Sequence, residues 1–424
     1  MYEKRRKYLI MKKDLVIIGG GAAGLSAAVE AKKQGIRDIL VLERSPYLGG
    51  ILRQCIHNGF GVHKYKEDLT GVEFAYRISS EALNADVECL TNTFALNISP
   101  QKVISAIHPE KGLFEIQAKA IILAMGCRER SRGALMIPGK RIAGIITAGT
   151  AQHYLNIDGY LPGKNIVILG SGDIGLIMAR QFVMEGAHVE HVVEIMPYSG
   201  GLARNISQCL EDFDIPISYN STIVDIQGKG RVEQVTIAKV DENRCPIPGT
   251  EFELPCDTLL ISAGLIPENE LTRAAGIELS ETTKGAVVDD NLMSSLEGVF
   301  SCGNVLHVHD LVDFVSMEGT KAGRSAARYL KMGAVENKAV SVKDGFGVNG
   351  VVPQKILFDG DDEVEFMFRP KNKYKNCKIC IDVDGNCIEE MKKMVVTPGE
   401  MCSFRVERTL LNQAEQDITV RLEV

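Results

Sequence analysis

The stretch DLVIIGGGAAG, residues 14–24, joins a short apolar run to a cluster of glycines. The run Asp14–Gly19 has the length and continuous hydrophobicity of one strand buried in a parallel sheet. An alanine-rich helical segment follows to about Gln34, where Gly35 ends it, and Asp38–Glu43 (DILVLE) has the pattern of the next strand. These features together predict a complete strand–helix–strand unit.

The same pattern returns later in the chain. The run NIVILG at Asn165–Gly170 predicts a buried strand, and the turn Gly170–Gly175 leads into a helical segment that Gly186 ends. The run HVEHVVE at His188–Glu194 predicts the second strand. In both copies an acidic residue lies 24 positions after the first glycine. Two matching units are much stronger evidence for nucleotide binding than one glycine motif.

Each unit has a further apolar strand near its far end. The runs Ile121–Gly126 (IILAMG) and Leu259–Gly264 (LLISAG) both end in small residues, and Gly298–Asn304 (GVFSCGN) predicts a strand and turn before a helical run around residues 321–329. From about Val335 the pattern changes to short β-like segments separated by turns. The segments are 364–368, 377–383 and 404–407, with turns at Asp384-Gly385 and Pro398-Gly399. We predict an α/β fold with two Rossmann-like domains and a small β-rich C-terminal domain.

Composition narrows the class of protein. The chain of 424 residues is too long for one hydrophobic core, and its net charge of −7 argues against a nucleic-acid binder. Its apolar runs are shorter than a membrane span needs. The basic start, residues 1–14, is interpreted as a flexible extension or an upstream start ahead of Met11, with a membrane-surface anchor as the alternative. The eleven scattered cysteines favour free thiols in the cytoplasm.

The glycines and acids of both units suit a dinucleotide. The first glycine permits a tight turn, the second lets a pyrophosphate approach the backbone, and the third lets the helix pack on the strand. The helix N-terminus attracts the pyrophosphate, and the acid accepts hydrogen bonds from ribose hydroxyls. These roles fit Gly19, Gly21, Gly24 and Glu43 in the first unit, and Gly170, Gly172, Gly175 and Glu194 in the second. The alternative is that both are glycine turns of an ordinary α/β sheet.

Glu194 also bears on the choice of nicotinamide cofactor. A carboxylate beside the ribose repels a 2′-phosphate unless a cation compensates. The following residues, Ile195–Ser199, include no arginine. We therefore expect NADH to be preferred over NADPH.

With these motifs the chain resembles the pyridine nucleotide–disulfide oxidoreductase superfamily over about residues 13–332. In that family an NAD-binding domain is inserted into an FAD-binding domain. The resemblance implies a flexible extension at 1–12, FAD-binding segments at 13–140 and 267–334, an NAD-binding domain at 141–266 and a β-rich domain at 335–424.

The resemblance also implies cofactor contacts beyond the glycines and acids of the two turns. For FAD the additional residues are Ala23, Arg44, Gly50, Ala124, Gly126, Gly303 and Asn304. For NAD they are Asp173, Ile174 and Gly264.

Four runs are similar to a narrower group within the superfamily. That group contains NADH-oxidase-like flavoproteins associated with glycerol-3-phosphate oxidase or dehydrogenase, and FAD subunits like those of opine oxidase and hydrogen cyanide synthase. The runs are Gly49–Gly61, Gly126–Gly139, Thr147–Gln152 and Cys302–Ser316.

Two departures from the family pattern stand out. The late flavin motif usually ends in Gly-Asp, whereas this chain has Gly303-Asn304. The paired redox cysteines of disulfide-reducing members are also missing, since Cys55 stands by itself after Gly50 and residues 147–154 contain no cysteine. We therefore expect neither a thioredoxin reductase nor a lipoamide dehydrogenase.

Five residues are candidates for reactive roles. Cys55 is either a redox thiol or a packed one, and His57 could act as an acid or base. Cys127 lies beside Arg128 and Arg130, which either stabilise a thiolate or pair with surface acids. The other two candidates, next to the late flavin motif, are His307 and His309, with a structural role as the alternative.

The C-terminal cysteines invite a zinc or iron–sulfur interpretation. Cys377 and Cys380 fall in a strand-like run, however, where positions three apart point to opposite faces. With Cys387 and Cys402 the spacing is also incomplete, so we expect no metal.

The leading functional hypothesis is an FAD-dependent NADH oxidoreductase. Its electrons would pass to oxygen, a quinone, another small acceptor or a partner protein, and the reverse flow fits the residues equally well. The second hypothesis is an electron-transfer subunit of a multi-component dehydrogenase or oxidase of the glycerol-3-phosphate or amino-acid type, within a homo- or hetero-oligomer. A flavin- or NAD-dependent sensor is the third.

Overall fold

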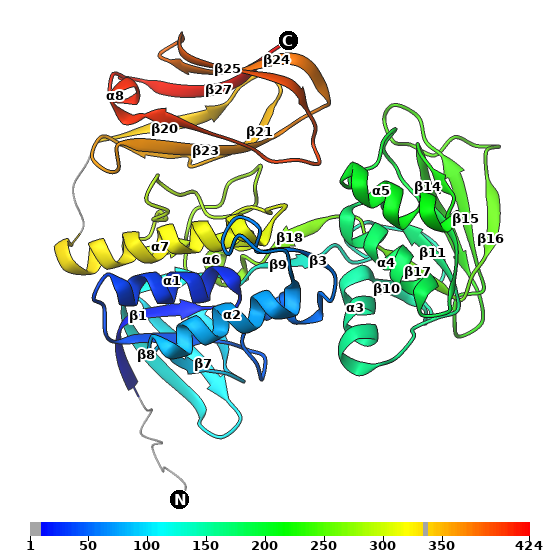
Figure 1. Ribbon diagram of the computed structural model, residues 1–424, viewed down its shortest axis with the longest axis horizontal. Helices are drawn as coiled ribbons and strands as arrows, with labels where there is room; N and C mark the ends of the chain where they lie inside the picture. Colours follow the sequence, from blue (N-terminus) through cyan, green and yellow to red (C-terminus); the bar gives the residue numbers. More distant parts are fainter. Residues whose placement is uncertain (1–9, 334–337) are drawn as a thin grey trace, which may run out of the picture. The chain divides into compact units, whose positions relative to one another are not determined.

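The computed structural model describes residues 10–333 and 338–424. Its chain forms two compact units, one of residues up to Cys127 together with Pro267–Val424, the other of Arg128–Ile266 (Figure 1). The second unit is thus inserted into the chain of the first. Among the described residues, no helix is long and apolar enough to cross a membrane.

A seven-stranded sheet lies at the centre of the first unit, in the order β5-β2-β1-β8-β7-β6, with β19 beside β8. Strands β5, β2, β1, β8 and β19 run parallel, and β7 and β6 extend the sheet antiparallel. The strands are β1 (Ile10–Ile18), β2 (Ile39–Leu42), β5 (Glu88–Leu90), β6 (Phe94–Ile98), β7 (Val103–His108), β8 (Gly112–Leu123) and β19 (Val299–Ser301). The repeat strand β1 is therefore central, which explains its unbroken apolar run.

The first strand begins earlier than the sequence indicated. Residues Ile10–Lys13 pair with Glu115–Ala118 of β8, so backbone pairing extends β1 toward the N-terminus of the predicted run. Of the extension expected at 1–12, Ile10–Lys12 are strand, and the other residues lie outside the described ones. The limit expected between 334 and 335 also lies outside them.

Two helices pack closely against each other over this sheet. Helix α1 (Ala22–Lys33) and helix α7 (Val312–Met332) lie side by side in Figure 1. A Cβ atom added at Gly319 would lie 2.2 Å from the carbonyl oxygen of Ala23, and one at Gly323 would lie 2.3 Å from that of Ala27. The Ser26 and Ser316 hydroxyls also share a hydrogen bond of 2.5 Å. Glycine is therefore required on α7 for the two backbones to approach.

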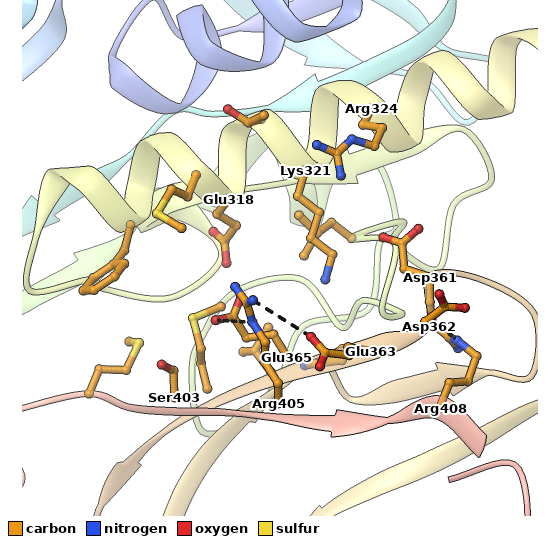
Figure 2. A pocket seen from close by; sticks show the side chains of 18 of the residues that line it. Glu318, Lys321, Arg324, Asp361, Asp362, Glu363, Glu365, Ser403, Arg405 and Arg408 are labelled. Carbon is orange, nitrogen blue, oxygen red and sulfur yellow. Dashed lines mark hydrogen bonds and ion pairs between the residues drawn. The ribbon is translucent and has the colours of Figure 1, made fainter. Parts of the chain in front are cut away.

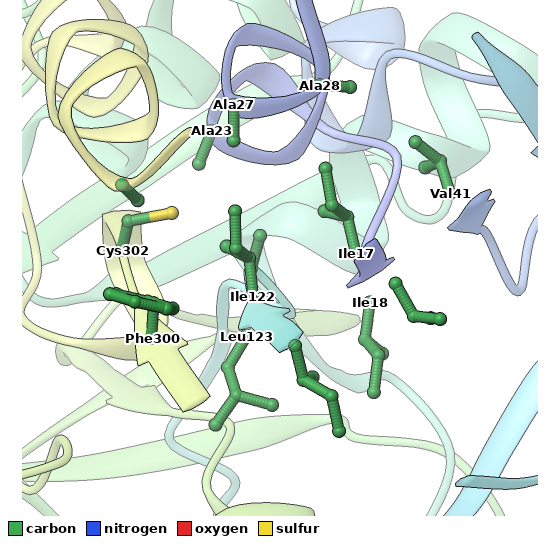
Figure 3. Packing of buried hydrophobic residues seen from close by; sticks show 14 of the residues in the cluster. Ile17, Ile18, Ala23, Ala27, Ala28, Val41, Ile122, Leu123, Phe300 and Cys302 are labelled. Carbon is green, nitrogen blue, oxygen red and sulfur yellow. The ribbon is translucent and has the colours of Figure 1, made fainter. Parts of the chain in front are cut away.

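The core beneath these helices joins segments that are distant in sequence. Figure 3 shows Ile17 and Ile18 of β1, Ile122 and Leu123 of β8, and Phe300 of β19 packed under Ala23 and Ala27 of α1. All of these side chains are buried. The late segment that carries β19 is thus part of the same core as the first strand.

The second unit repeats the parallel arrangement. Its five-stranded parallel sheet has the order β10-β17-β11-β12-β13, and a three-stranded antiparallel sheet, β14-β15-β16, accompanies it. The strands are β10 (Ile145–Thr147), β11 (Asn165–Leu169), β12 (His188–Val193), β13 (Ile217–Ser218), β14 (Ser221–Gln227), β15 (Gln234–Lys239), β16 (Phe252–Pro255) and β17 (Thr258–Ile261). The helices are α3 (Ala148–His153), α4 (Asp173–Met184) and α5 (Ala203–Cys209).

The C-terminal region is built from two sheets around its own core, as the β-rich prediction required. One has the order β22-β20-β27-β24-β25 and the other β21-β23-β26. Their elements are β20 (Ala339–Asp344), β21 (Val348–Val352), β22 (Lys355–Leu357), β23 (Glu363–Pro370), β24 (Tyr374–Val383), β25 (Asn386–Val396), β26 (Cys402–Glu407), α8 (Arg408–Leu411) and β27 (Asp417–Glu423). The predicted turn Asp384-Gly385 closes the β24–β25 hairpin with φ of 48° and 84°, as a two-residue hairpin turn needs.

Smaller elements complete the described chain. The helix α2 (Gly71–Asn84) begins with a capping box between Thr70 and Glu73. The others are β3 (Asn58–Phe60), β4 (Leu69–Thr70), β9 (Cys127–Glu129), β18 (Leu265–Pro267), α6 (Glu270–Ala274), a π-helical segment Tyr154–Asp158, and 3-10 turns at Gly50–Gln54, Glu211–Phe213 and Gly303–Val305.

The close approach of α1 and α7 can be tested with Gly323→Ala. Alanine improves helix propensity by up to about 1 kcal/mol, but its methyl group would press on the Ala27 backbone, and overpacking costs about 1–3 kcal/mol. We expect a net loss of stability, measured by denaturant unfolding followed by circular dichroism. Gly200→Ala is the control, because nothing lies within 4 Å of its added Cβ. Equal stability of both variants would contradict the packing argument.

Candidate functional site

The first glycine turn is held by its neighbours and leaves one position open. Gly19 has φ of 112°, and a Cβ atom there would lie 2.2 Å from the carbonyl oxygen of Ala124. A Cβ atom at Gly24 would lie 1.9 Å from the carbonyl oxygen of Gly19. At Gly21, in contrast, nothing lies within 4 Å. The first and third glycines are thus required by packing, and the second leaves space at the N-terminus of α1 for a pyrophosphate.

The acid that follows this turn is buried and binds the backbone. Glu43 is 6% exposed, and its carboxylate accepts hydrogen bonds of 2.8 Å from the N–H groups of Gly20 and Ser45. These bonds fix the carboxylate beside the turn, where a ribose hydroxyl of a bound dinucleotide could reach it. Arg44, the next residue, is exposed.

The second turn reproduces this geometry in the second unit. Gly170 has φ of 101°, and its Cβ would lie 2.1 Å from the carbonyl oxygen of Ser262. A Cβ at Gly175 would lie 2.8 Å from the carbonyl oxygen of Gly170, and Gly172 has nothing within 4 Å. Both turns therefore combine two packed glycines with one open glycine, as dinucleotide binding needs.

Glu194 corresponds to Glu43. It is 8% exposed and accepts hydrogen bonds from Ser171, through its N–H at 2.8 Å and its hydroxyl at 2.6 Å, and from the Met196 N–H at 2.8 Å. The charge of this carboxylate is therefore held at the turn by neutral donors.

Asp173 has a structural role that the sequence did not reveal. Its carboxylate accepts hydrogen bonds from the Leu202 N–H at 2.8 Å and the Asn205 Nδ2 at 2.6 Å, which hold the start of α5 beside the turn. The next residue, Ile174, is half-buried. Gly264 lies after β17, and its carbonyl accepts a hydrogen bond of 3.0 Å from the Arg130 N–H.

The late motif lies against the first turn. A Cβ atom at Gly303 would lie 2.9 Å from the Cβ of Ala23, and one at Gly50 would lie 3.2 Å from the Cα of Gly21. Gly126 is open, with nothing within 4 Å of an added Cβ. The structure thus brings the residues expected to contact FAD to one edge of the first sheet.

Asn304 is held through both ends of its side-chain amide. Its Oδ1 accepts a hydrogen bond of 3.0 Å from the His309 N–H, and its Nδ2 lies 3.6 Å from the Cys127 Sγ as a donor. An aspartate here could not donate to the thiol, whereas an amide both accepts and donates. The departure from the family's Gly-Asp therefore has a local structural use.

A buried carboxylate, Glu318 of α7, organises the residues after this motif. It accepts hydrogen bonds from the Gly303 N–H at 2.5 Å, the His307 Nε2 at 2.7 Å and the His309 Nε2 at 3.1 Å. Burial opposes its charge, but the two imidazoles hold the pKa of Glu318 well below its usual range. Burial likewise lowers the pKa of His307, against the attraction of Glu318. The His307 imidazole and the Glu318 carboxylate thus share a buried hydrogen bond.

The sequence pointed to both histidines but missed Glu318. The glutamate is 15 residues from Gly303, on a helix whose extent the sequence indicated only for residues 321–329. Only the folded chain brings α7 back over the motif. The signal in the sequence was a glutamate that shares a helix with the small residues Ser316, Gly319 and Gly323, because small residues mark the side of a helix that packs closely.

Cys55 and His57 lie near each other in sequence but differ in environment. Cys55 is 5% exposed, and burial raises the pKa of its thiol to about 12. A protonated thiol is a poor nucleophile, so this environment favours the packed alternative over a redox role. His57 is half-buried, its Nδ1 lies 3.0 Å from the Asn58 carbonyl oxygen, and its ring is 5.0 Å from that of Phe60.

A cavity of about 1110 Å³ lies between α7 and the C-terminal strands β23 and β26 (Figure 2). Helix α7 contributes Lys321 and Glu318, while the strands contribute Glu363, Glu365 and Arg405. Arg405 lies 3.7 Å from Glu365 and 4.0 Å from Glu363. The cavity wall is thus charged and mostly acidic on its strand side.

Two ionic contacts join the C-terminal sheets to earlier segments of the same unit at this cavity. Asp290 pairs with Arg408 at 2.5 Å, and both side chains are buried. Asp310 pairs with Arg369 and accepts a hydrogen bond of 2.7 Å from the Met401 N–H. The neighbouring His309 therefore lies between the flavin-type motif and the C-terminal strands.

Comparison with curated proteins finds distant relatives. The chain is 24% identical to one of the subunits of opine oxidase of Agrobacterium tumefaciens (strain Ach5), over 78% of this chain and 68% of that protein. It is 25% identical to the HcnB subunit of hydrogen cyanide synthase of Pseudomonas aeruginosa, over 74% and 68%. It is also 25% identical to thioredoxin reductase of Treponema pallidum, over 75% and 97%.

Solved structures share the fold. The chain resembles thioredoxin reductase of T. acidophilum with a TM-score of 0.62 and 24% identity, over 74% of this chain and 98% of that one. It resembles an NAD-dependent persulfide reductase from A. fulgidus with a TM-score of 0.59 and 18% identity, over 96% and 77%.

The family itself is established by a match over most of the chain. The model of the pyridine nucleotide-disulphide oxidoreductase family matches residues 13–326, which include both glycine turns and the late motif. Members of this family use FAD and NAD(P). The chain therefore belongs to the pyridine nucleotide-disulphide oxidoreductase family and is an FAD-dependent oxidoreductase.

Proposed function

We propose that this protein oxidises NADH with FAD as its resident cofactor, and that its electrons leave without passing through a cysteine pair. The supporting observation is the presence of two complete nucleotide-binding turns, each with a buried glutamate bound to the turn. When bound, FAD supplies the two-electron chemistry, and the protein aligns the nucleotides.

The turns suit different nucleotides. FAD is assigned to the first turn, because the late motif joins it through Gly303 and Ala23. NADH is assigned to the second turn. There Gly172 leaves space for a pyrophosphate, and Glu194 is positioned to accept hydrogen bonds from the ribose hydroxyls.

Glu318 is assigned a positioning role. It holds the Gly303 N–H directly, and Asn304 indirectly through His309. Its three hydrogen-bond partners are two imidazoles and one backbone amide, and through them it fixes the late motif. The Cys127 thiol accepts a hydrogen bond from Asn304, and the Arg130 N–H donates one to the Gly264 carbonyl. We propose that both residues contact a bound nucleotide and that neither reacts covalently.

The proposal of a route without a redox cysteine pair rests on two observations. Residues 147–154, where some disulfide-reducing members carry the pair, contain no cysteine. Cys55, on the flavin-binding side, has a pKa raised to about 12 by burial. Oxygen, a small acceptor or a partner protein remains as the acceptor.

A second candidate is the electron-transfer subunit of a larger enzyme. The opine oxidase and hydrogen cyanide synthase relatives are, by their names, subunits. In that case the protein would form a hetero-oligomer with a substrate-oxidising partner. We propose that this assembly is cytoplasmic. Little steady-state turnover by the purified chain, with turnover restored by a co-purifying protein, would favour this candidate.

The first prediction concerns reduction itself. Anaerobic NADH is expected to bleach the visible flavin absorption of the purified protein, and Cys55→Ala should leave the rate of bleaching unchanged. Stopped-flow absorbance is the measurement. A flavin that NADH fails to reduce would refute the proposal, and loss of bleaching in Cys55→Ala alone would return the cysteine to the electron path.

The second prediction concerns Glu194→Gln. The amide loses the charge-assisted hydrogen bonds to the ribose, so we expect kcat/KM for NADH to fall about tenfold, which corresponds to roughly 1.4 kcal/mol. Relief of the repulsion should at the same time raise kcat/KM for NADPH relative to NADH. Glu190→Gln, on the strand β12 that ends just before Glu194, is the control. An unchanged NADH-to-NADPH ratio in Glu194→Gln would exclude this carboxylate from cofactor selection.

The third prediction is a pH dependence from His307. Its lowered pKa means that the unfolded chain binds a proton that the folded chain does not, so stability falls as pH drops below about 6.5. The slope from this one group is at most about 1.4 kcal/mol per pH unit. His307→Gln should flatten the dependence in denaturant titrations, whereas the exposed His188→Gln should not. Identical slopes for the parent protein and His307→Gln would contradict the assignment.

A further inference from the structure

Two thiols and two carboxylates lie together on the outer face of the sheet that contains β24, β25 and β27. Cys380 of β24 is buried but does not belong to the core cluster that includes Ile379 and Ile381, so it lies on the other face of its strand. Cys387 is exposed at the start of β25. Neither thiol takes part in the nucleotide-binding site.

A register shift brings these two cysteines to the same face. Ile381 pairs with Glu389, but the next pair is Asp382 with Cys387, so β25 carries one extra residue there. In a regular ladder Cys387 would face Val383, whose side chain belongs to the core. The bulge instead places Cys387 on the side of Asp382 and Cys380.

The donor atoms have separations close to those of a tetrahedral metal shell. The two Sγ atoms and a carboxylate oxygen of Glu390 all lie within 4.8 Å of one another. Cys387 Sγ lies 4.0 Å from Glu390 Oε1, and Cys380 Sγ lies 3.9 Å from Glu423 Oε2. Zinc bonds of about 2.3 Å to sulfur and about 2.0–2.2 Å to oxygen place neighbouring ligands roughly 3.5–3.8 Å apart. Reaching these separations requires a contraction of up to about 1.3 Å within the group of Cys380, Cys387 and Glu390. Glu423, which lies outside that group but near Cys380, would complete the shell by a side-chain rotation.

The carboxylates are oriented toward the thiols by two cations. Lys378 Nζ binds Glu390 Oε2 at 2.8 Å and lies 3.7 Å from Glu423 Oε1, so it contacts the oxygens that the thiols do not. Arg421 Nη1 lies 3.3 Å from Glu423 Oε2, the oxygen that is 3.9 Å from Cys380 Sγ, and Arg421 Nε lies 2.6 Å from Asp382. Such outer contacts are how proteins orient ligating carboxylates.

We propose that Cys380, Cys387, Glu390 and Glu423 bind one Zn²⁺ ion. Both thiols release their protons to solvent on binding, so two positive charges are exchanged for two and the net charge of the cluster is unchanged. Thiolates select a soft or borderline ion, and the two carboxylates favour zinc over copper(I). The ion ties the edge strand β25 to β24 and β27, and it has a structural role because all four positions are filled by protein.

This site differs from the cysteine set that the sequence offered. Cys377 lies in the core on the opposite face from Cys380, so the two members of the Cys-x-x-Cys run belong to separate environments. Cys377 and Cys380 face opposite sides of β24, as expected for positions three apart in a strand. This orientation excludes a metal site that uses both of these cysteines, but not one that uses Cys380 with residues of other strands. Cys387 becomes a partner of Cys380 only through the bulge in β25.

The test uses the full chain, reduced and free of metal, with Co²⁺ as a spectroscopic probe and Zn²⁺ in competition with a chromophoric chelator. We expect one equivalent of metal and a thiolate-to-cobalt charge-transfer band that Zn²⁺ abolishes. Cys387 is exposed, so Cys387→Ser should fold like the parent chain. This variant should lose the charge-transfer band and weaken Zn²⁺ binding at least tenfold. Glu390→Gln should weaken Zn²⁺ binding while keeping the band.

Two matched controls separate this site from the rest of the protein. Cys245→Ser removes another exposed thiol and should bind metal like the parent chain. NADH-dependent flavin reduction should be unchanged in Cys387→Ser. Failure of the zinc proposal would therefore appear in metal binding alone, and failure of the proposed NADH oxidation would appear in flavin reduction alone. A missing thiolate band, equal Zn²⁺ binding by Cys387→Ser and the parent, or a Cys380–Cys387 disulfide that forms in preference to metal binding would each overturn the proposal.

Discussion

The close backbone contact between α1 and α7 is the constraint on which the first unit depends. Gly319 and Gly323 let α7 approach the carbonyl oxygens of Ala23 and Ala27, at the start of the helix that follows the first glycine turn. That approach brings Glu318 over the late motif and seats Gly303 against Ala23. Segments nearly 300 residues apart thereby complete one flavin-type site.

Buried carboxylates are the second recurring device of this protein. Glu43 and Glu194 each bind the N–H groups of their own turn, and Glu318 binds a backbone N–H and two imidazoles. A buried charge is costly unless hydrogen bonds compensate it, so each carboxylate specifies the position of the groups around it. The charge of each carboxylate is in this way fixed by hydrogen bonds, which suits the cofactor alignment that we propose.

The C-terminal region follows a different logic. It is joined to earlier segments of the first unit by two ionic contacts, Asp290 with Arg408 and Asp310 with Arg369. Arg408 and Asp310 also line the charged cavity of Figure 2. Its own sheet carries the proposed zinc site on the outer face, away from the core. The region therefore contributes both a surface near His309 and a separately stabilised edge strand.

The sequence by itself determined the duplicated glycine turns. Strand length, glycine spacing and the acid that follows the second strand are local features of the chain, and they do not depend on how distant segments pack. It also determined the α/β fold class and the β-rich character of the C-terminal region. It could not place Glu318, the bulge before Glu389 or the partner of Cys380, since each depends on how distant elements pair and pack. Cys55 shows the same limit, because the sequence left open whether its thiol is redox-active or packed, and only burial in the folded chain raises its pKa to about 12.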